Sequence, residues 1–269
     1  MKKYFLIPLL LLGACSVKFS DDTVKEEPVS DHALTMATLY QYYAEEYKAM
    51  AYQAFNIARE RIDEMIADNM VPEKLAIVVD IDETLLDNSP SEAILIERDT
   101  SYPYMWKEWC EMAVAKAVPG AVEFLQYADK KGFNIFYISN RKKKNEQAPS
   151  MKNLMELGFP QIDEEHFLLK IDRSEQNPDP SDKQSRRDEV GARGFEIVML
   201  IGDNLGDFYT DEMGTEARTG QLESYKEEFG KRFIILPNAM YGNWQKSLGI
   251  RDAETMDSLI RNMTSAFNQ

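Results

Sequence analysis

The chain has 269 residues, of which 44% are hydrophobic and 29% are charged, and these fractions are those of an ordinary globular protein. This length allows one large α/β domain, or a core domain with a small cap. The formal net charge of -15 argues against nucleic acid as a bulk partner, because duplex binding requires clustered Lys and Arg.

The start of the chain has the pattern of an export signal followed by a tether. Two lysines precede an apolar segment, residues 4–12, which is too short to span a bilayer. The sequence Leu-Gly-Ala-Cys at 12–15 resembles a bacterial lipobox, which predicts a signal peptide at 1–14 and lipidation of Cys15. An ordinary secretory signal with an incidental cysteine is the alternative. Residues 15–30 are polar and acidic and predict a tether.

Lipidation of Cys15 would hold the protein in the cell envelope. Several acyl chains on one cysteine give a stable membrane anchor, whereas a single chain binds only marginally. Ser16 follows the cysteine where an aspartate could stand, which by analogy with bacterial lipoproteins predicts the outer membrane, if the source has one. Cys110 is the only other cysteine, so the mature chain can form no intramolecular disulfide. We expect Cys110 to be a buried thiol in a helix.

Residues 31–269 are expected to form the folded domain. Apolar residues recur mostly at three- and four-residue spacing over 31–69, and they predict a helix that ends before Pro72. Residues 89–118 follow the first strand and predict a mostly helical insertion. The segments 31–72 and 89–118 are therefore expected to contribute a helical cap.

The rest of the domain alternates between strand and helix patterns. Short apolar runs, mostly rich in β-branched residues, predict buried strands at 75–79, 133–138, 166–169, 196–201 and 232–236. Helical patterns lie between and after them, at about 119–132, 149–157, 183–193 and 253–267. This alternation predicts an α/β protein with a doubly wound parallel sheet flanked by helices.

Polar side chains stand where three of these strands end. Asp80 and Asp82 follow the first strand, Ser139 follows the second, and Asp203 and Asp207 follow the fourth. In an open parallel sheet, ligands bind just outside the carboxyl ends of the strands. Hard divalent cations take oxygen ligands, so this edge could hold Mg²⁺. Solvated turns and helix N-caps are the alternatives for single aspartates. They account poorly for three strands that each end in polar residues of complementary chemistry.

In this order, these motifs resemble those of the haloacid dehalogenase-like (HAD) phosphohydrolases. More narrowly, they are similar to the class C acid phosphatases, which include bacterial outer-membrane lipoprotein 5′-nucleotidases. The resemblance rests on residues 79–85, 139–141, 182–183 and 202–208, and it extends to 51–56 and 236–244. It implies a HAD-like sheet with a small, mainly helical cap. The family commonly has a tyrosine where this chain has Ser91, which puts the family's substrate preference in doubt here.

The resemblance implies hydrolysis of a phosphate monoester through an aspartyl-phosphate. Asp80 is the expected nucleophile, and Asp82 is expected to act as general acid toward the leaving oxygen and then as base toward water. Mg²⁺ would be held by Asp80, the backbone carbonyl of Asp82 and Asp203. Asp207 would be a further ligand or would orient the others. A low pKa is expected for Asp80 beside the cation, and a raised pKa for Asp82.

Three further residues are expected to bind the phosphate. The resemblance implies that Ser139 and the backbone N–H of Asn140 contact phosphate oxygens at a helix N-terminus. It also implies that Lys183 neutralises charge on the phosphate and the nucleophile. A serine cap without a ligand and a solvated lysine are the alternatives. Arg186 and Arg187, in the same expected helix, are predicted to lie at the surface.

The substrate prediction depends on aromatic residues. Trp106, Trp109, Tyr241 and Trp244 lie in segments that could overhang the sheet edge. An aromatic face that stacks on a base is worth ~1–3 kcal/mol, so a nucleoside 5′-monophosphate is expected, with nicotinamide mononucleotide as one candidate. Packing of the cap onto the core is the alternative for each aromatic. The basic run at 141–144 is expected to be a solvated charge cluster, with a role near an anionic substrate as the alternative.

The sequence thus predicts a lipid-anchored, Mg²⁺-dependent acid phosphatase for small phosphorylated substrates. A phosphatase for non-nucleotide monoesters would share the chemistry and differ in the cap. The alternative from another class is a surface lipoprotein that binds haem or another ligand on a phosphatase scaffold. Such a protein would tolerate the substitution Asp80→Asn, whereas the enzyme would not. The family includes dimers, so a homodimer is a further expectation.

Overall fold

The computed structural model describes residues 29–174, 179–250 and 253–264. The predicted signal peptide at 1–14 and the predicted lipidation site Cys15 lie outside these residues, as does most of the tether. No helix in the described part of the chain combines the length and the apolar character needed to cross a membrane.

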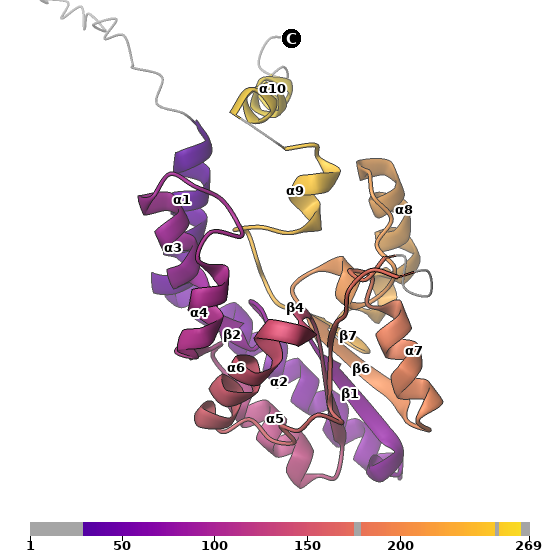
Figure 1. Cartoon of the computed structure of the whole chain (residues 1–269). Helices are drawn as coiled ribbons and strands as arrows, with labels where there is room; N and C mark the ends of the chain where they lie inside the picture. The colour runs from indigo at the N-terminus through magenta and orange to yellow at the C-terminus, as the bar shows by residue number, and fades with distance from the viewer. Residues whose placement is uncertain (1–28, 175–178, 251–252, 265–269) are drawn as a thin grey trace, which may run out of the picture.

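A five-stranded parallel sheet lies at the centre of the molecule (Figure 1). In spatial order its strands are β5 (Phe167–Lys170), β4 (Asn134–Lys142), β1 (Leu75–Val79), β6 (Glu196–Gly202) and β7 (Phe233–Ile235). The predicted doubly wound parallel sheet is confirmed. The chain builds outward from β1 through β4 to β5, and then returns to the other side of β1 with β6. The strand order therefore switches between β1 and β6, which is where ligands bind in such sheets.

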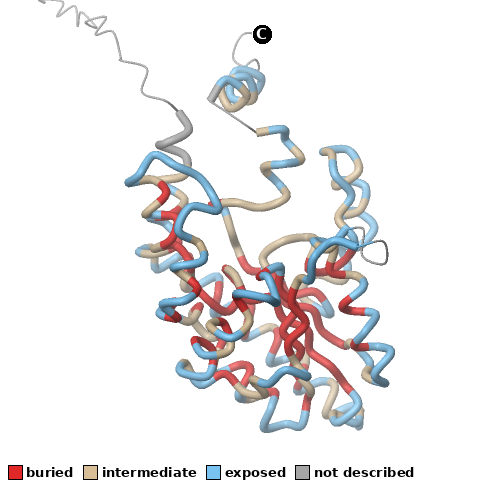
Figure 2. Tube along the Cα trace, viewed as in Figure 1, coloured by how far each residue is buried: buried red, intermediate tan, exposed pale blue. Residues whose placement is uncertain are grey.

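Helices cover both faces of the sheet. They are α2 (Glu45–Ala67), α5 (Ala121–Lys130), α6 (Lys143–Leu157) and α7 (Gln184–Ala192). Alternate side chains of β1 point to opposite faces. Val79 packs with buried residues of α2, α5 and α6, whereas Val78 packs with a buried valine of α7. Buried residues accordingly concentrate along the strands (Figure 2). These two apolar layers fix the strand ends in space.

The helix predicted over 31–69 is divided into two helices. The helix α1 (Val29–Tyr43) ends before Ala44, whose backbone is extended with φ -75° and ψ 130°, and α2 begins at the next residue. The two halves have different partners, because α1 packs against α3 (Ser89–Glu97) while α2 packs on the core. Helical periodicity continues across the break, so the sequence pattern alone does not reveal it.

The helix expected to begin near Pro149 begins earlier. In the structure α6 starts at Lys143, and Pro149 lies inside it. Proline cannot donate a backbone hydrogen bond, which is why the sequence pattern favoured a later start. The first turn is stabilised by Glu146, whose Oε2 accepts from the backbone N–H of Lys142 at 2.6 Å. This local hydrogen bond, together with the burial of Ser150, Asn153 and Leu154 on the same helix, outweighs the helix-breaking tendency of this proline.

The insertion forms a separate group of short elements above the sheet. The antiparallel pair β2 (Leu86–Asp87) and β3 (Lys116–Ala117) closes its base, and α3 and α4 (Trp106–Met112) lie between these strands in sequence. Cys110 is buried in α4, as predicted. Figure 1 shows α1, α3 and α4 on one side of the sheet's upper edge.

Three C-terminal helices complete this region, and the last of them packs against α1. These are α8 (Thr215–Tyr225), α9 (Asn243–Ser247) and α10 (Ala253–Thr264). The sequence analysis predicted α10 but neither α8 nor α9. The helix α8 has no buried residue and α9 is only five residues long, so neither carries a clear apolar periodicity.

Candidate active site

Three carboxylates meet at the edge where β1 and β6 lie side by side. Asp80 follows β1 directly, Asp203 follows β6, and Asp207 ends the short 3₁₀ helix η2 (Leu205–Asp207). Each offers an oxygen atom, and these atoms lie within 4.8 Å of one another. The parallel pairing of β1 and β6 brings the aspartates together although more than a hundred residues separate them in sequence. Three converging carboxylates are a ligand set that fits a hard divalent cation.

The loop after β6 holds Asp207 in place. Asn204 caps η2 by accepting from the backbone N–H of Gly206, and Asp207 Oδ2 accepts from the backbone N–H of Asn204 at 2.9 Å. This reciprocal capping satisfies donors at the start of the turn. Gly202 allows the approach, because a Cβ atom at this position would overlap the Asp207 side chain.

The substitution Gly202→Ala is therefore expected to displace Asp207. A displacement of about 1 Å in a catalytic group can lower activity ~10²-fold, and we expect a loss of that order in kcat for the reaction at this site. Gly191→Ala in α7 is the matched control, since a Cβ atom there meets nothing within 4 Å. It should retain activity and stabilise the fold by about 0.5–1 kcal/mol. Equal activity of the two variants would contradict the packing argument.

Lys183 brings a buried positive charge to the aspartates. It is the N-cap residue of α7, and its Nζ donates to Asp80 Oδ1 and, at 2.5 Å, to Asp207 Oδ1. Burial alone would lower the pKa of Lys183, but the Asp207 and Asp80 carboxylates outweigh it and raise that pKa. The lysine therefore stays charged.

One lysine does not neutralise three carboxylates. Burial raises the pKa of Asp80 to about 7, although Lys183 opposes the shift, and the charges of Asp207 and Asp82 add to it. Burial and the charges of Asp207 and Asp80 likewise raise the pKa of Asp203 well above its usual value. The low pKa expected for Asp80 is not found in the protein alone. A cation among these carboxylates would restore it, because opposite charge favours the ionised form.

Asp82 lies in a different environment from Asp80. Its Oδ1 accepts from Arg141 Nε at 2.9 Å, from Arg141 Nη2 at 2.7 Å and from Asn88 Nδ2 at 2.8 Å. Within the described part of the chain, its Oδ2 has only a long hydrogen bond from Ser139 Oγ, at 3.5 Å. One oxygen is thus held by three donors, and the other faces the site.

The expectation that 141–144 forms a solvated run is wrong for Arg141, which is 3% exposed. The strand β4 continues through Arg141, further than predicted, and turns its side chain inward toward Asp82. The neighbouring Lys142, Lys143 and Lys144 are exposed, as expected. In a strand every second side chain points to the same face, so Arg141 shares the buried face of Ser139. This periodicity was the signal that could have identified Arg141 as buried.

Ser139 and Asn140 lie at the end of the neighbouring strand β4. Ser139 is buried, and its Oγ accepts from the backbone N–H of Arg141 at 3.2 Å. Asn140 lies on the wall of the adjacent pocket. Arg186 supports both residues: its Nη1 donates to Ser139 O at 2.5 Å, and its Nη2 donates to Asn140 Oδ1 at 2.7 Å.

The predicted surface location of Arg186 and Arg187 is wrong, because they are 8% and 5% exposed. Arg187 Nη1 donates to the carbonyls of Gly206 and Asp207, at 3.1 and 3.0 Å. Both arginines thus brace the backbone of the site from α7. Their spacing from Lys183 is three and four residues, which places the three cations on one helical face. That spacing was the available signal.

A pocket with a volume of about 660 Å³ opens above these groups. Asp80, Asp82, Lys183, Asp203 and Asp207 line its catalytic end. All three aromatic residues predicted to contact the substrate, namely Trp106, Tyr241 and Trp244, line its walls. Trp109 does not line the pocket, and its Nε1 instead donates to Asn88 Oδ1 at 2.8 Å.

A parallel sheet with this set of carboxylates and a lysine at the switch between β1 and β6 defines a HAD-type phosphohydrolase. The family model described as HAD superfamily, subfamily IIIB (Acid phosphatase), matches residues 16–244. The chain therefore belongs to this family of acid phosphatases and is a phosphomonoesterase. The family resemblance drawn from the motifs is confirmed.

Solved structures lead to the same family. The chain is similar to the class C acid phosphatase from Bacillus anthracis, at 36% identity and a TM-score of 0.77. The match covers 88% of this chain and 98% of that one. A second structure of the Bacillus anthracis enzyme, with tungstate bound, matches at 37% identity, with the same TM-score and coverage.

Proposed function

We propose that the protein is a Mg²⁺-dependent acid phosphatase that hydrolyses nucleoside 5′-monophosphates through an aspartyl-phosphate at Asp80. The observation that carries this proposal is the position of Asp80. Its carboxylate lies beside Lys183 and two further aspartates at the bottom of a pocket whose walls carry three aromatic side chains. HAD enzymes generally depend on a divalent metal, which agrees with this cluster.

In the first step an Asp80 oxygen attacks phosphorus and forms an acyl phosphate, while the bond from phosphorus to the ester oxygen breaks. The leaving oxygen takes a proton from Asp82. We assign that proton to Oδ2, because Oδ1 is held by Arg141 and Asn88. In the second step Asp82 Oδ2 accepts a proton from water, the water oxygen attacks phosphorus, and Asp80 is released.

The carboxylates of Asp80, Asp203 and Asp207, with the backbone carbonyl of Asp82, would hold Mg²⁺. When bound, the ion supplies positive charge that stabilises the phosphoryl oxygens in the transition state. Asn238 Nδ2 donates to Asp203 Oδ2 at 2.8 Å and so fixes the orientation of that carboxylate. Orienting hydrogen bonds of this kind strengthen metal affinity.

Ser139, the backbone N–H of Asn140 and Lys183 are the proposed phosphate ligands. Arg186 holds the first two in place, and Lys183 is already fixed by two carboxylates. Tungstate is a tetrahedral oxyanion like phosphate, and its presence in the structure of a relative supports an oxyanion site in this fold.

Trp106, Tyr241 and Trp244 all line the pocket, which supports a nucleoside leaving group, because bases stack on aromatic faces. Trp106 also lies against Arg141, with 5.3 Å from Cζ to the ring centroid, so its ring position is tied to the Asp82 network. The same walls could accept a nicotinamide mononucleotide or another aromatic monoester.

We further propose export and lipidation at Cys15, with α1, α3 and α4 as the cap. Labelling of cells with a radioactive fatty acid tests the anchor: wild type should be labelled and Cys15→Ser should not. Light scattering of the mature protein tests the homodimer that the family resemblance implies.

Metal removal should abolish activity. The mature protein is expected to release phosphate from AMP, CMP and 4-nitrophenyl phosphate at pH 5 to 7 with Mg²⁺, with the nucleotides preferred in kcat/KM. EDTA should leave at most about 1% of the activity, because a bound metal supplies several kcal/mol of transition-state stabilisation. Added Mg²⁺ should restore it. Full activity in EDTA would contradict the metal assignment, and hydrolysis of 4-nitrophenyl phosphate alone would contradict the nucleotide assignment.

A further inference from the structure

Glu92, on the cap side of the pocket, has no assigned role. It lies on α3, it is 8% exposed, and it lines the pocket together with Leu95, Tyr102 and Trp106. No hydrogen bond or ion pair to its carboxyl group is found among the described residues. The side chain is mostly buried, and its carboxyl oxygens keep their remaining exposure on the pocket side, where a ligand can supply the missing hydrogen-bond donor.

The surroundings of Glu92 separate it from the catalytic carboxylates. Burial alone raises its pKa to about 7, and no charged neighbour contributes to the shift. Tyr102, which also lines the pocket, is neutral near pH 7, because the ordinary pKa of a tyrosine lies near 10 and its surroundings raise it further. Lys246 lies elsewhere on the pocket wall, near Asn243. Glu92 lines the pocket from α3, whereas the groups proposed to bind the phosphate lie at the edge of the sheet, so it is placed to meet the leaving group.

We propose that Glu92 is a specificity-determining residue that accepts a hydrogen bond from an N–H or O–H donor on the leaving group. A site built to receive a donor rejects analogues that lack it, because its buried acceptor is then left unpaired. The geometry thus selects phosphate monoesters with a donor-bearing leaving group, such as an aminated base or a ribose. This inference rests on the proposed nucleotide hydrolysis for its substrates but not on the identity of the nucleophile.

The test compares wild type with Glu92→Leu and the isosteric Glu92→Gln. The substrates are AMP, purine riboside 5′-monophosphate without the amino group, 2′,3′-dideoxy-AMP without the hydroxyls, and 1-naphthyl phosphate without any donor. Glu92→Leu should lower kcat/KM for AMP about 10- to 100-fold, which is the range for a hydrogen bond to a charged group. It should change the value for 1-naphthyl phosphate less than about twofold. The nucleotide whose loss is smallest identifies the missing donor.

The pH profile gives a readout that a packing role would not change. The ionised carboxylate is the stronger acceptor, so the wild-type preference for AMP over the donor-deficient nucleotide should increase as the pH rises through about 7. Glu92→Gln cannot titrate, and its preference should stay constant from pH 5.5 to 8. The exposed Glu97, on the same helix, gives the control Glu97→Gln, which should behave as wild type.

An equal loss for all substrates in Glu92→Leu would overturn the proposal, and so would an unchanged kcat/KM for AMP. Failure of the nucleotide proposal has a different signature: wild type would hydrolyse 1-naphthyl phosphate but no nucleotide. In that case phenyl phosphate with and without a para amino group replaces the nucleotides. Glu92→Leu must then lower activity only toward the amine, or the proposal fails.

Discussion

Asp80→Asn is expected to lower kcat/KM for every phosphate monoester by about 10⁴-fold or more, because an amide cannot attack phosphorus. Loss of the nucleophile also removes one carboxylate from the metal set. The fold should survive, since Lys183 keeps its ion pair with Asp207. Removal of a buried carboxyl whose pKa is raised to about 7 should not lower the melting temperature above pH 7 in metal-free buffer.

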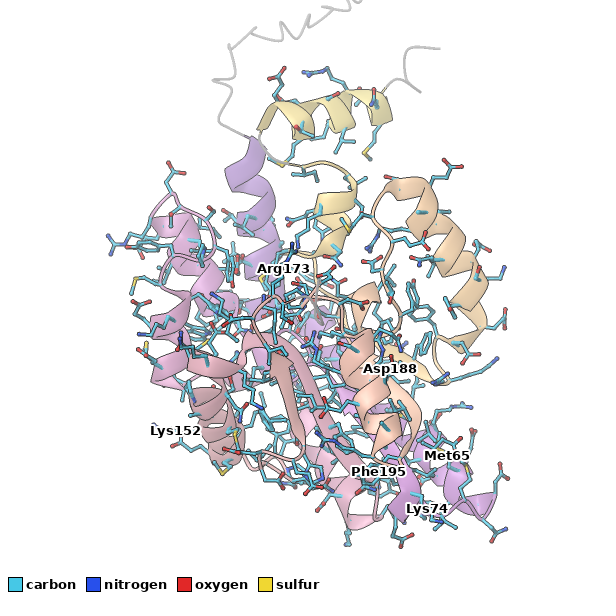
Figure 3. All side chains as sticks on the ribbon, turned by 45° about the vertical axis from the view of Figure 1, so that its right-hand side comes forward. Met65, Lys74, Lys152, Arg173, Asp188 and Phe195 are labelled. Carbon is cyan, nitrogen blue, oxygen red and sulfur yellow. The ribbon has the colours of Figure 1, made fainter. Side chains whose placement is uncertain are left out.

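The sign of that expectation follows from the direction of the shift. A carboxyl whose pKa is higher in the folded than in the unfolded state stabilises the fold less as the pH rises. For Asp80 this loss occurs between its ordinary pKa of 3.8 and its raised pKa of about 7. Asp188→Asn is the matched control, because Asp188 is an exposed aspartate on α7 (labelled in Figure 3). It should retain full activity. If Asp80→Asn kept more than a few per cent of wild-type kcat/KM, the nucleophile would be another group.

Lys183→Met is expected to have the second largest effect. Its loss would leave Asp80 and Asp207 buried without their cation, and breaking a buried ion pair costs about 3–5 kcal/mol of folding stability. Activity should also fall, by about 10²–10³ in kcat, which is the usual loss on removal of one group that stabilises the transition state. Calorimetry in metal-free buffer and steady-state kinetics with saturating Mg²⁺ separate the two effects.

Added Mg²⁺ should raise the melting temperature of Lys183→Met more than that of wild type, because the ion would replace the missing charge. Lys152→Met is the control, since Lys152 (labelled in Figure 3) is exposed on α6. The distance from Lys152 Nζ to Glu156 Oε1 is 3.9 Å. Exposed pairs of this kind contribute about 0–1 kcal/mol. If Lys183→Met had the stability and kcat of Lys152→Met, the buried charge network would have no energetic role.

The strand ends were predictable from the sequence because their physical causes are local. A run of five apolar residues, rich in β-branched side chains and ending in Asp80, favours a buried strand, and β1 has the predicted bounds. Parallel strands share their carboxyl edge, so Asp203 was expected near Asp80 before any coordinates were known. The structure also places Lys183 beside these aspartates. The prediction of this lysine came from the family motif and not from helical periodicity.

The arginines that support the site were not predicted, because the groups that they bind are distant in sequence. Arg186 and Arg187 bind carbonyls of Ser139, Gly206 and Asp207, and Arg141 binds Asp82. Charged side chains are mostly exposed, so composition favours the surface unless a partner is known. The break between α1 and α2 has the same origin, since it depends on what each helix packs against.

Trapping the acyl phosphate tests the central claim most directly. Wild type and Asp82→Asn would be quenched in acid during turnover of a phosphate monoester with Mg²⁺, reduced with borohydride, and digested for peptide mass spectrometry. Borohydride converts an aspartyl-phosphate to homoserine. We predict homoserine at position 80, with more in Asp82→Asn, because that variant lacks the base that assists hydrolysis. Homoserine at another position, or its absence during full turnover, would contradict the assignment of Asp80 as the nucleophile.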